Sequence, residues 1–149
     1  MRTFLKSLLL IIPCLLVTSV AQAQITDTSC TAQKVYYSLA DALKEPDQVK
    51  YLDLSMNKLT AFPVEILQLK NLECLDLSFN RIPTLPAELT QLTHLHYINL
   101  MGTRYMAKAP AVLGKMPSLK TVDLSDHPEW SAATFNEAKA LMPNVKILK

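Results

Sequence analysis

From residue 49 onward, large apolar residues recur in one arrangement about every 23 residues. Each copy opens with an apolar residue and carries two more, three and five positions later, as at Val49, Leu52 and Leu54. The copies begin at residues 49, 72, 95, 119 and 145, and the fifth is short. Because self-similarity at a fixed period of about 20–50 residues is typical of solenoid proteins, we predict one stack of repeats over residues 49–149.

The two-residue step inside each copy predicts a short strand. Side chains two positions apart point to the same side of a strand, so Leu52 and Leu54 are expected to face a core. Tyr51, Asp53 and Ser55 then face the opposite side. A proline recurs in the second half of three copies and favours a short helical or extended return segment there, at Pro63, Pro86 and Pro110.

A polar residue follows each predicted strand, where the chain turns away from the sheet. Asn57 and Asn80 stand there in the first two copies, and an amide side chain can satisfy backbone groups that no neighbouring strand reaches. Thr103 and His127 replace asparagine in the later copies. We therefore expect a ladder of side-chain hydrogen bonds that weakens toward the C-terminus.

The full pattern is L-x-x-L-x-L-x-x-N-x-L followed by x-x-L-P-x-x-I/L-x-x-L, and it resembles the leucine-rich repeat over residues 49–148. The 23-residue spacing and the Leu-Pro step are similar to the Ras-group subclass, here of a secreted bacterial type. The resemblance implies an α/β fold: a solenoid shaped as a short horseshoe, with parallel strands on its concave face and helical or irregular convex segments. It also implies that partners dock on the concave face.

Two flanking segments are predicted to be helical caps on the repeat stack. Residues 37–46 have Ser38 and Asp41 spaced as a capping pair and Pro46 as a stop. Residues 134–143 have a similar pattern and lengthen the fourth copy. The last strand, residues 145–149, has no polar cap behind it, so an open edge that pairs with a second copy is an alternative use of this end.

Residues 1–23 have the three parts of a secretory signal peptide. Arg2 and Lys6 precede an apolar run over residues 7–20, and Ala21-Gln22-Ala23 supplies the small residues of a cleavage site before Gln24. The alternative is a membrane anchor, but the run is shorter than the roughly 20 residues that span a bilayer. We expect export to the periplasm, the cell surface or the medium, with residues 24–48 forming an N-terminal arm and capping helix.

Composition narrows the function further. The whole chain carries a net charge of +2, and the two cations of the leader account for it, which leaves residues 24–149 neutral. This balance gives no electrostatic reason to expect nucleic acid or an anionic membrane as partner, and no stable membrane insertion is expected once the leader is removed. The chain has 2 glycines, so a glycine-rich phosphate-binding loop is excluded.

The candidate chemical groups do not predict catalysis or a cofactor. Ser125-Asp126-His127 has the residue types of a triad, but sequence neighbours cannot line up as nucleophile, base and orienter. His94 and His96 lack a third metal ligand and are expected at the surface, and nothing in the Asp spacing demands calcium. With 25 residues before Val49 and none after the fifth strand, we expect no catalytic domain.

Cys30 and Cys74 remain after removal of the leader. An exported chain permits a disulfide between them, and the spacing does not favour this over two unrelated thiols.

The outward strand positions form columns across the repeats. The first column contains Tyr51, Cys74, Tyr97, Thr121 and Ile147, and the next two contain Asp53, Asp76, Asn99, Asp123 and Ser55, Ser78, Met101, Ser125. Beside them run Met56, Phe79, Gly102 and Asp126, with Lys58, Arg81 and Arg104 at the rim.

Exposed aromatic residues and methionines beside an acidic stripe are typical of a protein-binding surface. The candidate partner-binding residues are Tyr51, Asp53, Ser55, Met56, Asp76, Ser78, Phe79, Tyr97, Asn99, Met101, Arg104, Thr121, Asp123 and Ser125. The alternative interpretation is that Leu-Asp-Leu-Ser is ordinary repeat scaffold. The sequence thus predicts an exported, non-catalytic module that binds a protein or glycan, with a structural or self-associating envelope protein as the alternative.

Overall fold

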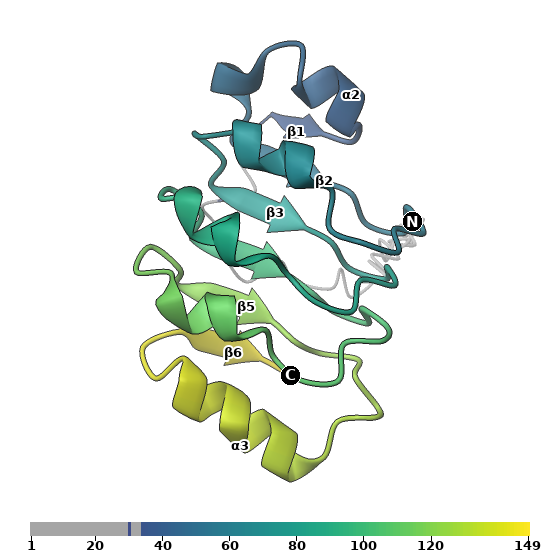
Figure 1. Ribbon diagram of the computed structural model, residues 1–149, viewed down its shortest axis with the longest axis vertical. Helices are drawn as coiled ribbons and strands as arrows, with labels where there is room; N and C mark the ends of the chain where they lie inside the picture. The colour runs from purple at the N-terminus through teal and green to yellow at the C-terminus, as the bar shows by residue number, and fades with distance from the viewer. Residues whose placement is uncertain (1–29, 31–33) are drawn as a thin grey trace, which may run out of the picture.

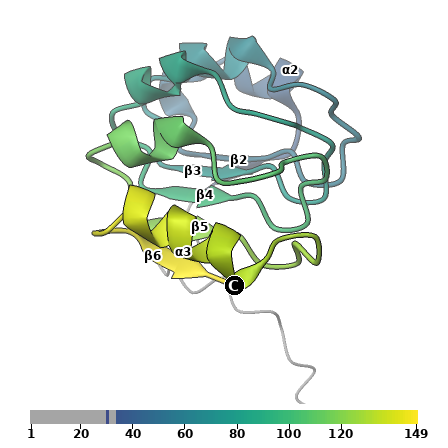
Figure 2. The same ribbon diagram turned by 60° about the horizontal axis from the view of Figure 1, so that its bottom comes forward.

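The computed structural model describes residue 30 and residues 34–149, and these build one parallel sheet backed by short helical segments (Figure 1). Its strands follow each other in sequence order. They are β1 (Val35–Tyr36), β2 (Tyr51–Asp53), β3 (Cys74–Asp76), β4 (Tyr97–Asn99), β5 (Thr121–Asp123) and β6 (Lys146–Leu148). Figure 2 shows the strands on one side of the stack and the helical segments on the other. The predicted α/β leucine-rich repeat solenoid is confirmed.

The return segments are single 3₁₀ helices that begin directly after the recurring prolines. They are η2 (Val64–Gln68), η3 (Ala87–Gln91) and η4 (Ala111–Lys115). Proline lacks an amide hydrogen and has a fixed φ, so it suits the position just before a helical turn. Each turn buries apolar residues in the core: Ile66 in η2, Leu89 in η3, and Val112 and Leu113 in η4. These turns close one continuous core of stacked leucines between the two layers.

Helical segments flank the first and last full repeats, as predicted. At the N-terminal end lie α2 (Leu39–Ala42) and η1 (Pro46–Gln48), and the Ser38 hydroxyl caps α2 by accepting from the Asp41 backbone N–H at 3.3 Å. At the other end, Ser131 caps α3 (Ala132–Leu141) by accepting from the Thr134 backbone N–H. The end of α3 packs against η4 at Gly114, where a Cβ would lie 2.6 Å from the Leu141 carbonyl oxygen. Glycine is therefore needed for this close packing.

The polar ladder at the strand ends is continuous. Asn80 Nδ2 donates to the Leu54 carbonyl of the preceding repeat at 2.9 Å, and Asn80 Oδ1 accepts from the Leu59 N–H at 2.9 Å. Thr103 Oγ1 donates to the Leu77 carbonyl at 3.3 Å. His127 Nε2 lies 2.9 Å from the Leu100 carbonyl oxygen. Threonine and histidine thus keep the inter-repeat bond where asparagine is missing, although each makes fewer bonds to the backbone than Asn80.

Two details of the sheet differ from the prediction. β1 adds a strand ahead of the first repeat, where an arm was expected, and Val35 pairs with Tyr51. The register of β6 is also shifted by one residue, because Lys146 rather than Ile147 pairs with Thr121. Ile147 pairs with the buried Val122 and packs on the core, so it takes the inward position that Leu75 and Ile98 hold in their own strands. Placing Ile147 in the outward column was therefore wrong.

Two further predictions concern membranes and export. Within the described part of the chain, no helix is both long enough and apolar enough to span a bilayer, and α3 has 10 residues. The predicted signal peptide, residues 1–23, lies outside the described residues and stays a prediction. The domain boundaries at residues 23 and 48 are likewise untested.

Candidate functional site

The acidic column on the concave side holds the turns that follow the strands. In β2, β3 and β5 the Oδ1 atoms of Asp53, Asp76 and Asp123 each accept the backbone N–H two residues further on, at 2.8–2.9 Å. Asn99 makes the same bond to the Met101 N–H. A short aspartate or asparagine side chain that bonds its own backbone two residues on is a standard turn device. These contacts support the scaffold interpretation of the column.

Burial disfavours the charged forms of Asp76 in this column and of Tyr51 beside it. Burial raises the pKa of Asp76, while hydrogen bonds from Ser78 and from Asn99 Nδ2, at 2.8 Å, lower it. Burial, with the nearby charges of Asp76 and Asp53, also raises the pKa of Tyr51 to about 12. Both shifts arise because a charged form is held away from water.

The accessible part of the concave side lies at the end of the strands. Met56 is 70% exposed and Phe79 44% exposed, while Ser55, Met101 and Ser125 are half-buried and Ser78 is buried. Met56, Phe79, Gly102 and Asp126 occupy the same position of successive repeats and share a left-handed backbone, with φ between 54° and 59°. The left-handed turn residue therefore recurs at this position of each repeat.

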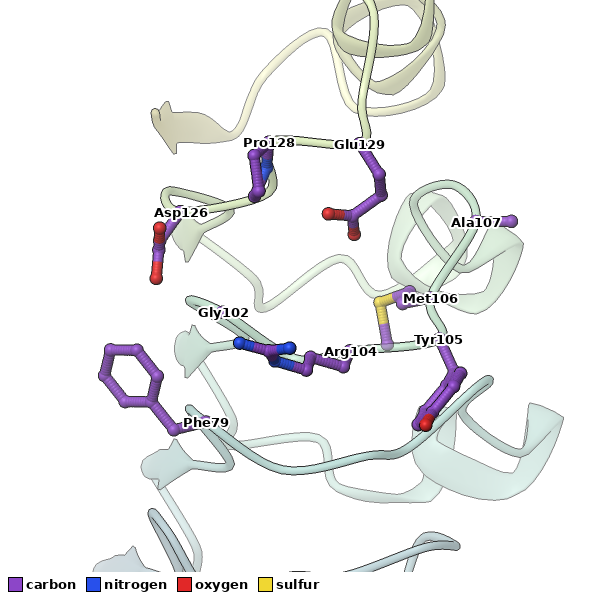
Figure 3. A pocket seen from close by; sticks show the side chains of 9 residues that line it. All are labelled: Phe79, Gly102, Arg104, Tyr105, Met106, Ala107, Asp126, Pro128 and Glu129. Atoms are coloured by element: carbon purple, nitrogen blue, oxygen red, sulfur yellow. The ribbon is translucent and has the colours of Figure 1, made fainter.

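A pocket of about 550 Å³ lies where the loops after β3, β4 and β5 meet (Figure 3). It is lined by Phe79, Gly102, Arg104, Tyr105, Met106, Ala107, Asp126, Pro128 and Glu129. Of these, only Phe79 and Arg104 were among the candidate partner-binding residues. Tyr105 and Glu129 belong to loops whose path the repeat pattern does not specify. The repeat pattern placed Gly102 and Asp126 in one column with Phe79, and this shared column was the only sign in the sequence that they lie together.

Gly102 allows the two sides of this pocket to approach each other. A Cβ on Gly102 would lie 2.7 Å from Phe79 Cδ1 and 3.2 Å from Asp126 Oδ2, so the ring and the carboxylate both flank this glycine. Behind them, His127 Nδ1 lies 3.1 Å from Glu129 Oε1. A backbone N–H lowers the pKa of Glu129, and His127 and Arg104 act in the same direction. Glu129 is therefore a carboxylate at neutral pH.

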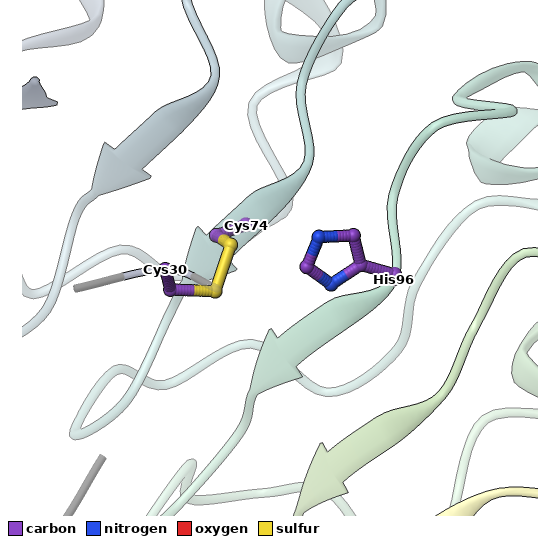
Figure 4. Close-up of side chains that lie close together, drawn as sticks. All are labelled: Cys30, Cys74 and His96. Atoms are coloured by element: carbon purple, nitrogen blue, oxygen red, sulfur yellow. A yellow bond between two sulfur atoms is a disulfide. The ribbon is translucent and has the colours of Figure 1, made fainter. Parts of the chain in front are cut away.

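The first outward column, which contains Tyr51, Cys74, Tyr97 and Thr121, is buried. A disulfide joins Cys30 to Cys74 (Figure 4), and Cys30 packs in one apolar cluster with Tyr51 and Tyr97, which are 5% and 3% exposed. Thr121, next in the column, is also buried. The prediction that Tyr51 and Tyr97 are exposed was wrong. Its physical reason is that the bridge holds Cys30 over strands whose outward side chains would otherwise meet water.

His96 lies beside the bridge, so placing it at the surface with His94 was also wrong. Its ring and the two sulfur atoms form a group whose potential ligand atoms all lie within 4.8 Å of one another (Figure 4). Disulfide sulfur is not a thiolate, so this arrangement does not supply the donors of a zinc site. His96 Nε2 lies 3.8 Å from Glu73 Oε2, whose other oxygen pairs with Lys50 Nζ at 2.8 Å. His94 is exposed.

The stacked strands, prolines and polar ladder define a leucine-rich repeat solenoid, and the comparisons with known proteins agree. The family model described as leucine-rich repeat region matches residues 27–146, so the chain belongs to this family. Repeat domains of this family generally bind proteins, and they are typically non-catalytic. The Ras-group subclass and the secreted type stay predictions.

A similar solved structure is that of a leucine-rich repeat protein of Leptospira interrogans, with 27% sequence identity and a TM-score of 0.52. The match covers 78% of this chain and 35% of that chain, so this chain spans about a third of that protein's length. No curated protein matches the chain.

Proposed function

We propose that this chain is an exported, non-catalytic module that binds a protein partner through the accessible part of its concave side. The observation that carries the proposal is the exposure of Met56 and Phe79 in one column of consecutive repeats. Exposed methionine and aromatic side chains are enriched in protein interfaces, and adjacent repeats offer them as one extended surface. The half-buried Ser55, Met101 and Ser125 beside them complete the contact surface.

The disulfide supports the export part of this proposal. Disulfides persist in oxidising compartments and are rare in the cytosol, so a bridge between Cys30 and Cys74 fits a protein that folds after export. The periplasm, the cell surface and the medium all satisfy this condition.

The binding experiment needs variants that leave the turns intact. Charge reversal at Asp53, Asp76 or Asp123 would remove the carboxylates that cap the turns and confuse binding with folding. Met56→Glu changes an exposed side chain instead, and Val64→Glu is its matched control, because Val64 is 60% exposed but stands on the helical side in η2. Both should fold like the parent chain by circular dichroism.

The expected result is that envelope and extracellular extracts yield a partner retained by the parent and by Val64→Glu but lost with Met56→Glu. Binding to all three proteins, or loss only with Val64→Glu, would place the interface elsewhere and refute concave-side binding.

A second candidate function is self-association through β6. This strand pairs with β5 on one side and is the last strand of the sheet. An unpaired strand edge is a template for another strand, and the exposed Lys146 is the kind of residue that protects such edges. Light scattering at rising concentration tests this candidate: a dimer supports it, and a monomer at high concentration refutes it.

A further inference from the structure

The pocket at the loop ends combines opposite charges, and Arg104 is close enough to Glu129 to help lower its pKa. The Arg104 guanidinium makes no ion pair within 4.0 Å among the described residues, and Asp126 makes none either. Glu129 contributes a second carboxylate, which His127 Nδ1 approaches from behind. Figure 3 shows the Arg104 side chain extending toward Gly102 in the space lined by these groups. The pocket therefore offers several hydrogen-bond donors and acceptors together.

Its remaining walls are apolar and accessible. Tyr105 is 71% exposed and Phe79 is nearly half exposed, and the exposed Pro128 contributes further apolar surface, while Met106 is buried behind them. The volume of about 550 Å³ lies in the range of roughly 300–1,000 Å³ that is usual for small-ligand sites, which combine apolar walls with a few polar groups. The size and lining fit a ligand that is a compact ring with one apolar face.

The charges indicate whether that ligand is ionic. An anionic ligand would meet the carboxylates of Asp126 and Glu129, and a cationic one would meet the guanidinium of Arg104. A neutral hydroxyl avoids both conflicts, because it donates one hydrogen bond and accepts others. Neighbouring hydroxyls on one ring can donate to the carboxylates while they accept from the guanidinium.

We propose that this pocket binds an uncharged saccharide unit, with the ring's C–H face against Phe79 or Tyr105 and its hydroxyls on Arg104, Asp126 and Glu129. This site shares Phe79 with the proposed protein-binding surface, but Met56 lies outside the pocket. A change at Met56 can therefore remove protein binding and leave saccharide binding intact. Gly102 is essential to the site, because a side chain there would fill the space between Phe79 and Asp126.

The test is a calorimetric titration of the full chain, with its disulfide formed, with neutral saccharides and their charged counterparts. The neutral probes are lactose and triacetylchitotriose, with sialyllactose as the anionic counterpart of lactose and deacetylated chitotriose as the cationic counterpart of triacetylchitotriose. We expect at least one neutral saccharide to bind with a dissociation constant below about 1 mM, which corresponds to about −4 kcal/mol. Its charged counterpart is expected to bind at least tenfold more weakly.

Matched variants locate the binding. Arg104→Gln and Asp126→Asn should each weaken binding of the neutral saccharide at least tenfold. Arg81→Gln should leave it unchanged, because Arg81 holds the same exposed position one repeat earlier, outside the pocket. Met56→Glu should also leave it unchanged, which separates this site from the protein-binding proposal. The proposal is overturned if no neutral probe binds, if a charged counterpart binds more tightly, or if Arg104→Gln and Asp126→Asn bind like the parent.

Discussion

His127 Nε2 lies 2.9 Å from the carbonyl oxygen of Leu100, and this contact is equivalent to the one that Asn80 makes with Leu54. The ring also stacks on Trp130, with centroids 4.4 Å apart, and Trp130 Nε1 donates to the Met106 carbonyl at 2.6 Å. Histidine thus replaces the ladder asparagine and also anchors the loop that carries Glu129. The last full repeat and the pocket wall depend on the same buried side chain.

His127→Ala is expected to lower the free energy of unfolding by roughly 2–4 kcal/mol, because it leaves the Leu100 carbonyl without its partner and opens a cavity beside Trp130. His127→Asn should lose clearly less, since its amide can restore the bond of the ladder. Urea unfolding followed by Trp130 fluorescence measures both. Equal losses for the two variants would mean that the stack on Trp130, and not the ladder, is what stabilises this turn.

Gly102→Ala is expected to destabilise the protein by about 1–3 kcal/mol. The larger part is steric, since the new Cβ would lie 2.7 Å from the Phe79 ring. The backbone part is about 1 kcal/mol, the cost of a left-handed φ for a residue with a Cβ, which Met56 and Phe79 also bear in their own repeats. In a Phe79→Ala background, the cost of Gly102→Ala should therefore fall to about 1 kcal/mol, as measured by a double-mutant cycle with thermal unfolding. An unchanged cost would refute the steric explanation.

The repeated part of the fold could be predicted because each repeat contains the residues that determine its own strand and turns. Leu52 and Leu54 define a strand face, Pro63 precedes the helical return segment, and Asn80 marks the ladder, so these predictions required only local periodicity. β6 was misaligned because the 26-residue fourth unit includes α3, and one residue fewer separates its first apolar position from the strand. Periodicity cannot report such a shift.

The accessible surface was harder to predict, because it depends on segments outside the repeat. The packing of Cys30 over Tyr51 and Tyr97 follows from a disulfide that the spacing alone does not favour. Tyr105 and Glu129 reach the pocket from loops without a repeated pattern. A sequence with a strong period therefore reveals its core more readily than its binding site.

The disulfide is expected to contribute about 4 kcal/mol to stability. The bridge closes a loop across a sequence separation of 44 residues, and loop-closure entropy gives about this value at 25 °C. A Cys30→Ser, Cys74→Ser double variant should therefore unfold at lower urea concentration than the oxidised parent. Adding a reductant should shift the parent toward the variant and leave the variant unchanged. If reductant has no effect on the midpoint of the parent under unfolding conditions, the bridge does not contribute as argued.

Tyr51 is expected to make the folded protein less stable at alkaline pH. Its pKa is raised from 10.0 to about 12 in the folded protein, so between these values the unfolded chain releases a proton that the folded chain retains. Ionisation then favours the unfolded state, and this contribution to stability falls as pH rises from about 10 to about 12. Tyr51→Phe lacks this proton, so its unfolding midpoint should decline less over the same interval. Absorbance at the phenolate band should also show one late-titrating tyrosine fewer in Tyr51→Phe than in the parent. Identical pH profiles for the two proteins would show that Tyr51 is accessible to water and that Cys30 does not cover this column in solution.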